Sequence, residues 1–133
     1  MGRSIGAVVA AFLLWTVLWL AFGAGAQVLM PELVAAGQPV THTGVLLAYL
    51  VWSVLISALA GYVCAAVKRE RPLKTVWIFA LILLFVGIGV EASAWALTPV
   101  WYHLVFLTLL VPAAVWGGGV RTRTADPVTV AAQ

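Results

Sequence analysis

The chain has 133 residues, of which 65% are hydrophobic and only 8% are charged, with seven Lys/Arg against four Asp/Glu. A soluble domain carries roughly 25% charged residues, and a folded monomer of this length cannot bury so much apolar surface. The composition therefore excludes a soluble enzyme, a disordered tail protein and a disulfide-stapled secreted module. Cys64 is the only cysteine, so no internal disulfide bond can form.

The first predicted element is a membrane-spanning helix over residues 4–26, which contain no ionisable side chain. A helix needs about 20 apolar residues to cross about 30 Å of hydrocarbon, and it satisfies its own backbone polar groups there. A secretory signal is the alternative, because Arg3 precedes the run and Ala24-Gly25-Ala26 resembles a cleavage site. The run exceeds the usual ~7–15 residues of such a signal, so we expect a retained span.

A sizeable loop is predicted over residues 27–42, which contain two prolines and a glycine, and a second span over residues 43–67. Small residues recur at every fourth position of this span: Ser53, Ser57, Gly61 and Ala65. A shorter stripe begins the chain: Gly2, Gly6 and Ala10. Small residues let helix backbones approach closely in lipid, where apolar burial does not drive association. We expect both stripes to pack inside one chain; a dimer interface is the alternative.

The third span is predicted over residues 75–97 and the fourth over residues 99–120. Between them, Thr98-Pro99 offers a capping hydroxyl and a proline for the first helical turn. Three glycines at positions 117–119 are expected to end the fourth helix, because glycine ends helices at low cost. Residues 121–133 are small, polar and proline-bearing, and we expect a flexible tail there.

All seven basic residues lie beside span ends that share one side of a four-span arrangement. They are Arg3 before the first span, the central group Lys68, Arg69, Arg71 and Lys74, and Arg121 and Arg123 after the fourth. The positive-inside rule then places both termini in the cytoplasm. We predict a single transmembrane domain over residues 1–133, an all-α, up-down-up-down four-helix bundle in the inner membrane. The central group would also contact lipid head groups, and it is too short to indicate nucleic-acid binding.

One acid, Glu91, and one histidine, His103, lie inside the predicted spans. Glu91 lies seven residues before Thr98 and His103 five residues after it, so a tight antiparallel hairpin brings both to similar depth. An unpaired carboxylate in hydrocarbon costs at least about 2.5–3.5 kcal/mol. We therefore expect Glu91 and His103 to lie within hydrogen-bonding reach.

Glu32 and His42 share the outer side of the bundle with Glu91 and His103. Two carboxylates and two imidazoles are ligands for a divalent metal, or carriers of protons. No pair of the four has the spacing of one helical turn, so we favour a structural pair plus two solvated loop residues. The sequence leaves a metal site open, and we predict no cofactor. No phosphate-binding loop, Ser-His-Asp order or haem ligand pair can be assembled, so we predict no enzyme.

Several short motifs are spread over most of the chain. They are Arg3-Ser4-Ile5-Gly6-Ala7-Val8, Ala48-Tyr49, Ala60-Gly61-Tyr62, Arg71-Pro72, Trp101-Tyr102, Pro112 and Trp116-Gly117-Gly118. With these motifs the chain resembles small, uncharacterised four-span proteins of bacterial inner membranes. The proteins it resembles often carry an arginine after the Ala-Tyr pair, where this chain has Leu50. The resemblance implies the four-span fold and no activity, because none is established for that group.

The sequence favours a non-enzymatic role: a small multi-pass protein of the lipid bilayer that packs against itself or against a larger membrane complex. The alternative is a small transporter or channel subunit that uses Glu91 and His103 as a proton or cation site. Transport requires Glu91 to face a polar cavity or a symmetric partner, whereas the packing role makes no such demand.

Overall fold

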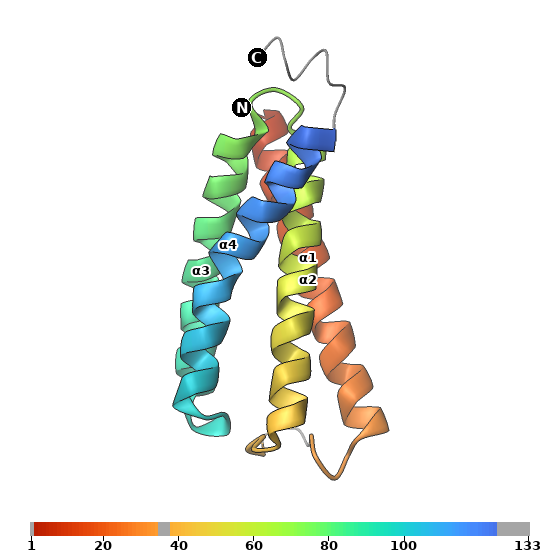
Figure 1. The fold of residues 1–133 in the computed structure, drawn as a ribbon, viewed down its shortest axis with the longest axis vertical. Coiled ribbons are helices and arrows are strands. Elements are labelled where there is room, and N and C mark those ends of the chain that lie inside the picture. Colours follow the sequence, from red (N-terminus) through yellow and green to blue (C-terminus); the bar gives the residue numbers. More distant parts are fainter. Residues whose placement is uncertain (1, 35–37, 125–133) are drawn as a thin grey trace.

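The computed structural model describes residues 2–34 and 38–124, and these residues form an all-α bundle (Figure 1). Its elements are α1 (Gly2–Leu29), α2 (Thr43–Val67), α3 (Pro72–Ser93), the short 3-10 helix η1 (Trp95–Leu97) and α4 (Val100–Thr124). No strand occurs in the described ranges. All four α-helices are long and apolar enough to cross a membrane. The predicted all-α class is confirmed.

The helices differ from the predicted spans mainly where α3 meets α4. α2 has the predicted bounds of residues 43–67, whereas α3 begins at Pro72 and ends at Ser93, four residues before the predicted end. The chain turns there through η1, so its last residues do not extend the helix. Of the predicted tail, residues 121–124 form the last turn of α4, and residues 125–133 lie outside the described part.

The glycines at positions 117–119 do not end α4, contrary to the sequence-based expectation; they lie inside it. A Cβ atom at Gly117 would overlap the backbone carbonyl of Ala58, and one at Gly61 would overlap the carbonyl of Ala114. α2 and α4 therefore touch backbone to backbone, which only glycine permits at these two positions. Close packing therefore explains Gly61 and Gly117, whereas a Cβ atom at Gly119 would meet no atom within 4 Å.

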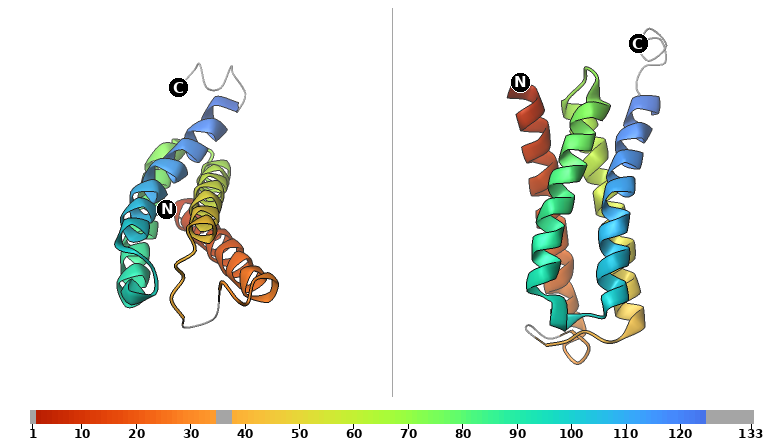
Figure 2. Two further views of the ribbon diagram at one scale, coloured as in Figure 1. Left: turned by 60° about the horizontal axis from the view of Figure 1, so that its bottom comes forward. Right: turned by 90° about the vertical axis from the view of Figure 1, so that its left-hand side faces the viewer.

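The four helices run alternately up and down, so the α1–α2 and α3–α4 connections lie at one end of the bundle and the α2–α3 connection at the other (Figure 2). The start of α1, the α2–α3 connection and the end of α4 lie together at one end, which carries all seven basic residues and is called the basic end below. The opposite end holds the α1–α2 loop and the α3–α4 connection, and is called the loop end. α2 packs against each of the other three helices, whereas α1 packs mainly on α2, less on α3, and reaches α4 through the Trp19–Phe106 contact.

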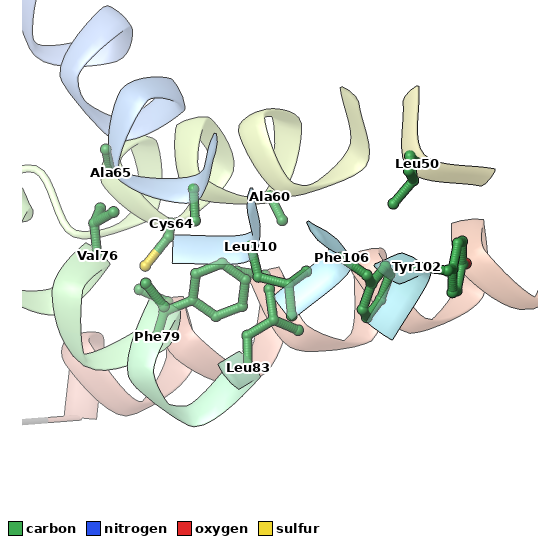
Figure 3. Packing of buried hydrophobic residues seen from close by; sticks show 14 of the residues in the cluster. Leu50, Ala60, Cys64, Ala65, Val76, Phe79, Leu83, Tyr102, Phe106 and Leu110 are labelled. Atoms are coloured by element: carbon green, nitrogen blue, oxygen red, sulfur yellow. The ribbon is translucent and has the colours of Figure 1, made fainter. Parts of the chain in front are cut away.

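Side chains from α2, α3 and α4 form most of the core of the basic half (Figure 3), and Ala7 and Ala11 of α1 belong to the same cluster. Phe79 and Leu83 of α3 and Leu110 of α4 are almost completely buried, and they face Ala60 and Cys64 of α2. The small residues of α2 leave room for these larger side chains. Cys64 is a buried packing residue here.

Aromatic side chains join α1 to α2. Trp15 stacks on Trp19, with ring centroids 5.3 Å apart, and its Nε1 donates a hydrogen bond to Ser57 Oγ at 2.9 Å. Trp52 Nε1 donates to the carbonyl oxygen of Leu18 at 3.1 Å. Each of these indole N–H groups thus finds a hydrogen-bond partner on the other helix, which an apolar interior would not otherwise offer. The two hydrogen bonds fix the register of α1 against α2.

The two small-residue stripes differ in burial. The α2 stripe, which consists of Ser53, Ser57, Gly61 and Ala65, is buried within the chain. The stripe at the start of α1 does not pack inside the chain, contrary to expectation: Gly2 and Gly6 are exposed, and a Cβ atom added at either would meet no atom within 4 Å. Ala7 and Ala11 occupy the buried face of α1 in their place.

Candidate functional site

The connection between α3 and α4 is tight enough to bring the two ends of these helices together. Backbone hydrogen bonds from Ala94 N–H to the Val90 carbonyl (3.1 Å) and from Leu97 N–H to the Ala94 carbonyl (2.9 Å) close the turn. Thr98 is extended, with φ −140° and ψ 160°, and α4 follows it. The hairpin is therefore short enough to bring Glu91 and His103 to similar depth, as expected from the sequence.

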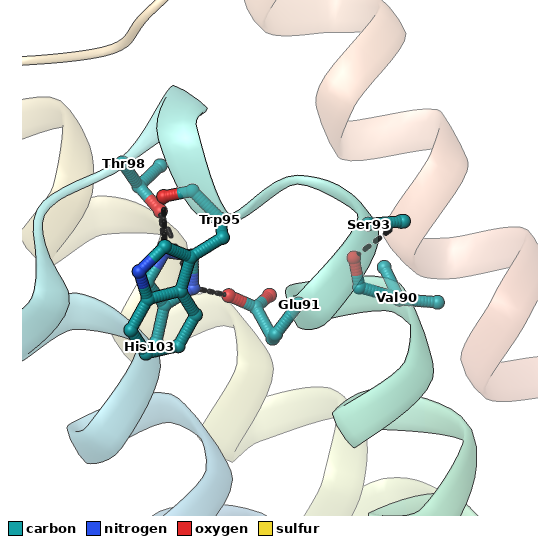
Figure 4. A network of polar contacts seen from close by, with 6 residues as sticks. All are labelled: Val90, Glu91, Ser93, Trp95, Thr98 and His103. Carbon is teal, nitrogen blue, oxygen red and sulfur yellow. Dashed lines mark hydrogen bonds and ion pairs between the residues drawn. The ribbon is translucent and has the colours of Figure 1, made fainter.

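Glu91 and His103 lie in direct contact in this hairpin, where the sequence analysis expected them within hydrogen-bonding reach. His103 Nδ1 and Glu91 Oε2 form a hydrogen-bonded pair (Figure 4). His103 is completely buried, and Glu91 is 6% exposed. The other ring nitrogen, Nε2, lies 3.0 Å from the Trp95 carbonyl oxygen and 3.0 Å from Thr98 Oγ1.

Two side chains from the connection enclose the imidazole of His103. The Trp95 ring stacks on it, with centroids 4.4 Å apart and an angle of 8° between the planes. Thr98 directs its hydroxyl at His103, although the sequence suggested that this hydroxyl caps the start of α4. The stacked indole covers one face of the imidazole, and His103 has no exposed surface.

The hydrogen-bond partners of His103 determine where its protons lie. A backbone carbonyl only accepts, so Nε2 carries a proton and donates it to the Trp95 oxygen. One further proton is shared between Nδ1 and the Glu91 carboxyl group. On Nδ1 it gives an ion pair, and on Glu91 it gives two neutral groups; both arrangements satisfy every partner. The pair therefore has zero net charge with this proton in place.

A cavity of about 260 Å³ adjoins the pair at the loop end. All four helices and the α1–α2 loop contribute to its wall: Trp19, Gln27, Val34, Gln38, Val40, Leu46, Tyr49, Val90, Glu91, Ala94, Leu97, Thr98 and Tyr102. Val40 N–H donates to the Leu97 carbonyl at 2.8 Å, which ties the loop to the α3–α4 connection at this wall. Glu91 lines the cavity, whereas His103 lies behind it.

The other two candidates from the outer side do not join Glu91 and His103. His42 is the N-cap of α2, and its Nδ1 accepts a hydrogen bond from Val45 N–H at 3.3 Å. Glu32 is exposed in the α1–α2 loop. Within residues 2–34 and 38–124, no group of three or more His, Cys, Asp or Glu is arranged to hold a metal ion. The four-ligand metal site considered from the sequence is not assembled in the described structure.

The basic residues lie at the opposite end of the bundle from this site. The central group of Lys68, Arg69, Arg71 and Lys74 occupies the α2–α3 connection and the start of α3. Arg71 has a left-handed backbone with φ 45°, directly before Pro72 begins α3. Arg121 of α4 lies over the Tyr62 ring of α2 at 5.9 Å, a cation–π contact that links these helices at the basic end.

Sequence reasoning missed most of the cavity wall. The depth argument that paired Glu91 with His103 would also have found Tyr49, which lies six residues after Thr43 at the start of α2. Tyr102 was available as the neighbour of His103. No local signal indicates Gln38, because its position depends on how the loop folds back.

The chain matches no protein-family model, no curated protein and no solved structure. Of what the resemblance to small bacterial four-span proteins implies, the structure therefore shows only the four apolar helices.

Proposed function

We propose that this chain is an integral, multi-pass protein of the cell's inner membrane. Large apolar side chains are exposed on all four helices, among them Val17 at 62%, Phe85 at 73% and Trp116 at 63%. Apolar surface of this extent is unfavourable in water and favourable in hydrocarbon. The lipid bilayer is the environment that these surfaces fit.

Both termini lie in the cytoplasm in this proposal, because every basic residue lies at the basic end and none at the loop end. Reporter fusions after Gln133 and within the α1–α2 loop test the orientation. A fluorescent protein is expected to fold at the C-terminal site, and alkaline phosphatase to be active only at the loop site. Phosphatase activity at the C-terminal site would overturn the proposed orientation.

The role that we propose within the membrane is non-enzymatic: a packing or accessory component that associates with a second copy or with a larger membrane complex. The observation that carries it is the sparse burial of α1, of which only Ala7, Ala11 and Ala26 are buried. The exposed Gly2 and Gly6 add a surface on which another helix can approach closely.

Association through α1 is tested with Gly6→Leu, which adds bulk on the exposed face. Crosslinking in native membranes is expected to show a complex that this variant loses. Gly89→Leu is the matched control, since Gly89 is exposed on α3 and has no near neighbour. If both variants behave as the unmodified chain does, association does not involve this face of α1.

A second candidate function is a small transporter or channel subunit that uses Glu91 and His103 as a proton or cation site. The specific observation in its favour is that Glu91 lines a cavity, which is the condition that transport imposes. The backbone contacts of α2 with α4 at Gly61 and Gly117 fill the basic half, so this state of the chain presents a pocket at one end. Loss of proton or cation flux in Glu91→Gln, with folding retained, would support this candidate. Unchanged flux would exclude it.

A further inference from the structure

The cavity at the loop end combines one carboxylate with aromatic and aliphatic walls. Trp19, Tyr49 and Tyr102 supply rings, and Glu91 is the only charged residue among the described residues of the wall. The nearest basic residues along the sequence are at the other end of the bundle. An anion would meet no positive partner here, whereas a cation would meet a carboxylate and ring faces, both of which attract it.

The orientation of the Glu91–His103 pair adds to this preference. Glu91 contacts the cavity, while the imidazole lies behind it and is completely buried. In the ion-pair arrangement the negative end of the dipole therefore faces the cavity. Within the described residues the carboxylate uses Oε2 for His103, and neither Oε1 nor the Tyr102 hydroxyl forms a side-chain hydrogen bond. Since every fully buried side-chain N or O there has a partner, these two oxygens keep accessible surface, and both residues line the cavity.

The wall also distinguishes among cations. A divalent metal ion needs several oxygen ligands to replace its hydration shell, and no group of three acidic, His or Cys side chains meets in the described ranges. An organic ammonium ion carries its own apolar surface, which the aliphatic wall residues can cover. A cavity of about 150 Å³ accommodates benzene, so about 260 Å³ suits a ligand of about ten non-hydrogen atoms.

We propose that this cavity binds a small organic ammonium ion, with the Glu91 carboxylate as its counter-ion and Trp19, Tyr49 and Tyr102 as its aromatic enclosure. The inference rests on the second candidate function and names the chemical class of its ligand. Glu91 would accept hydrogen bonds from the ammonium group through Oε1, while Oε2 keeps its contact with His103. Binding needs no covalent change, and it favours the arrangement in which the shared proton lies on His103 Nδ1 and Glu91 is a carboxylate.

The test uses three probes of similar shape and different charge: phenethylammonium, 2-phenylethanol and phenylacetate. They are titrated into the full chain in lipid nanodiscs, with binding followed by calorimetry and by fluorescence of the Trp residues. We expect the ammonium to bind at least about tenfold more tightly than the alcohol, and phenylacetate most weakly, as a charge-assisted hydrogen bond implies. Equal affinity for the ammonium and the alcohol would overturn the proposal.

Glu91→Gln is the decisive variant, because its amide can donate to His103 Nδ1 and so preserve the pairing while it removes the charge. We expect the preference for the ammonium over the alcohol to disappear and the affinity for the alcohol to stay within about twofold. Glu32→Gln is the matched control, since Glu32 is an exposed acid at the same end outside the cavity wall. If both variants lost the preference for the ammonium equally, the preference would come from the total negative charge at this end, and the assignment to Glu91 would be overturned.

Ala94→Leu provides a variant that fills the cavity without touching the pair. Ala94 lines the cavity at the end of α3, and we expect the larger side chain to weaken binding of the ammonium and the alcohol alike. Unchanged binding in Ala94→Leu would place the probes elsewhere and overturn the site. If neither the ammonium nor the alcohol binds the unmodified chain at millimolar concentration, the inference fails, whereas the second candidate function fails only if flux is unchanged in Glu91→Gln. If the alcohol alone binds, only the charge assignment fails.

Discussion

The two halves of the bundle are packed in different ways. In the basic half, α2 and α4 meet through backbone atoms at Gly61 and Gly117, and small side chains fit around Phe79 and Leu83. In the loop half, the helices are held apart by large aromatic rings, and a polar pair and a cavity lie between them. Close packing suits a region that only stabilises the fold, whereas a binding site requires space and polar groups that reduce packing.

The largest effect is expected from breaking the polar pair in the loop half. His103→Leu leaves the buried Glu91 carboxylate without a partner, and removal of one member of a buried pair costs about 3–5 kcal/mol. The free energy of unfolding is measured by denaturant titration in detergent micelles, with helix content followed by circular dichroism.

The double variant Glu91→Leu/His103→Leu is the control for His103→Leu. It removes both polar groups, so we expect it to recover more than half of the lost stability. A double variant no more stable than His103→Leu alone would show that the Trp95 and Thr98 contacts, rather than the orphaned carboxylate, determine the cost.

The next effect is expected in the basic half. Gly61→Ala places a methyl group against the Ala114 carbonyl, and overpacking of this kind costs about 1–3 kcal/mol. Gly89→Ala is the matched control, because a Cβ at this exposed glycine meets no atom within 4 Å. We expect this change to be neutral or to stabilise α3 by about 0.5–1 kcal/mol, since alanine favours helix over glycine. Equal destabilisation by both substitutions would contradict a backbone contact at Gly61.

The comparison of the two halves also explains what the sequence could predict. Four apolar runs of sufficient length indicate four helices without any tertiary information, and the depth of Glu91 and His103 follows from residue counts in a hairpin. The role of Gly117 could not be predicted, because a glycine near a helix end is equally consistent with termination and with close packing. Only the partner helix decides between these two uses.

The cavity was outside the range of sequence reasoning for a different reason. Its wall combines α1, the α1–α2 loop, α2, α3 and α4, and the loop is fixed there by the contact of Val40 with Leu97, 57 positions apart in the sequence. Spacing rules describe one element at a time. A site formed by several elements becomes visible only when their packing is known.

The smallest effect is expected at the start of α2, where His42 caps the helix. His42→Ala removes the acceptor for Val45 N–H, and loss of an N-cap costs about 1 kcal/mol. The change should act locally, so hydrogen exchange is expected to increase at the amides of Val45 and Leu46 and to stay unchanged at Gly61. Thr41→Ala is the control, since Thr41 is exposed beside the cap and forms no side-chain hydrogen bond within the described residues. Faster exchange at Gly61 as well would mean that the two halves unfold as one unit, and the difference in packing between them would then have no counterpart in stability.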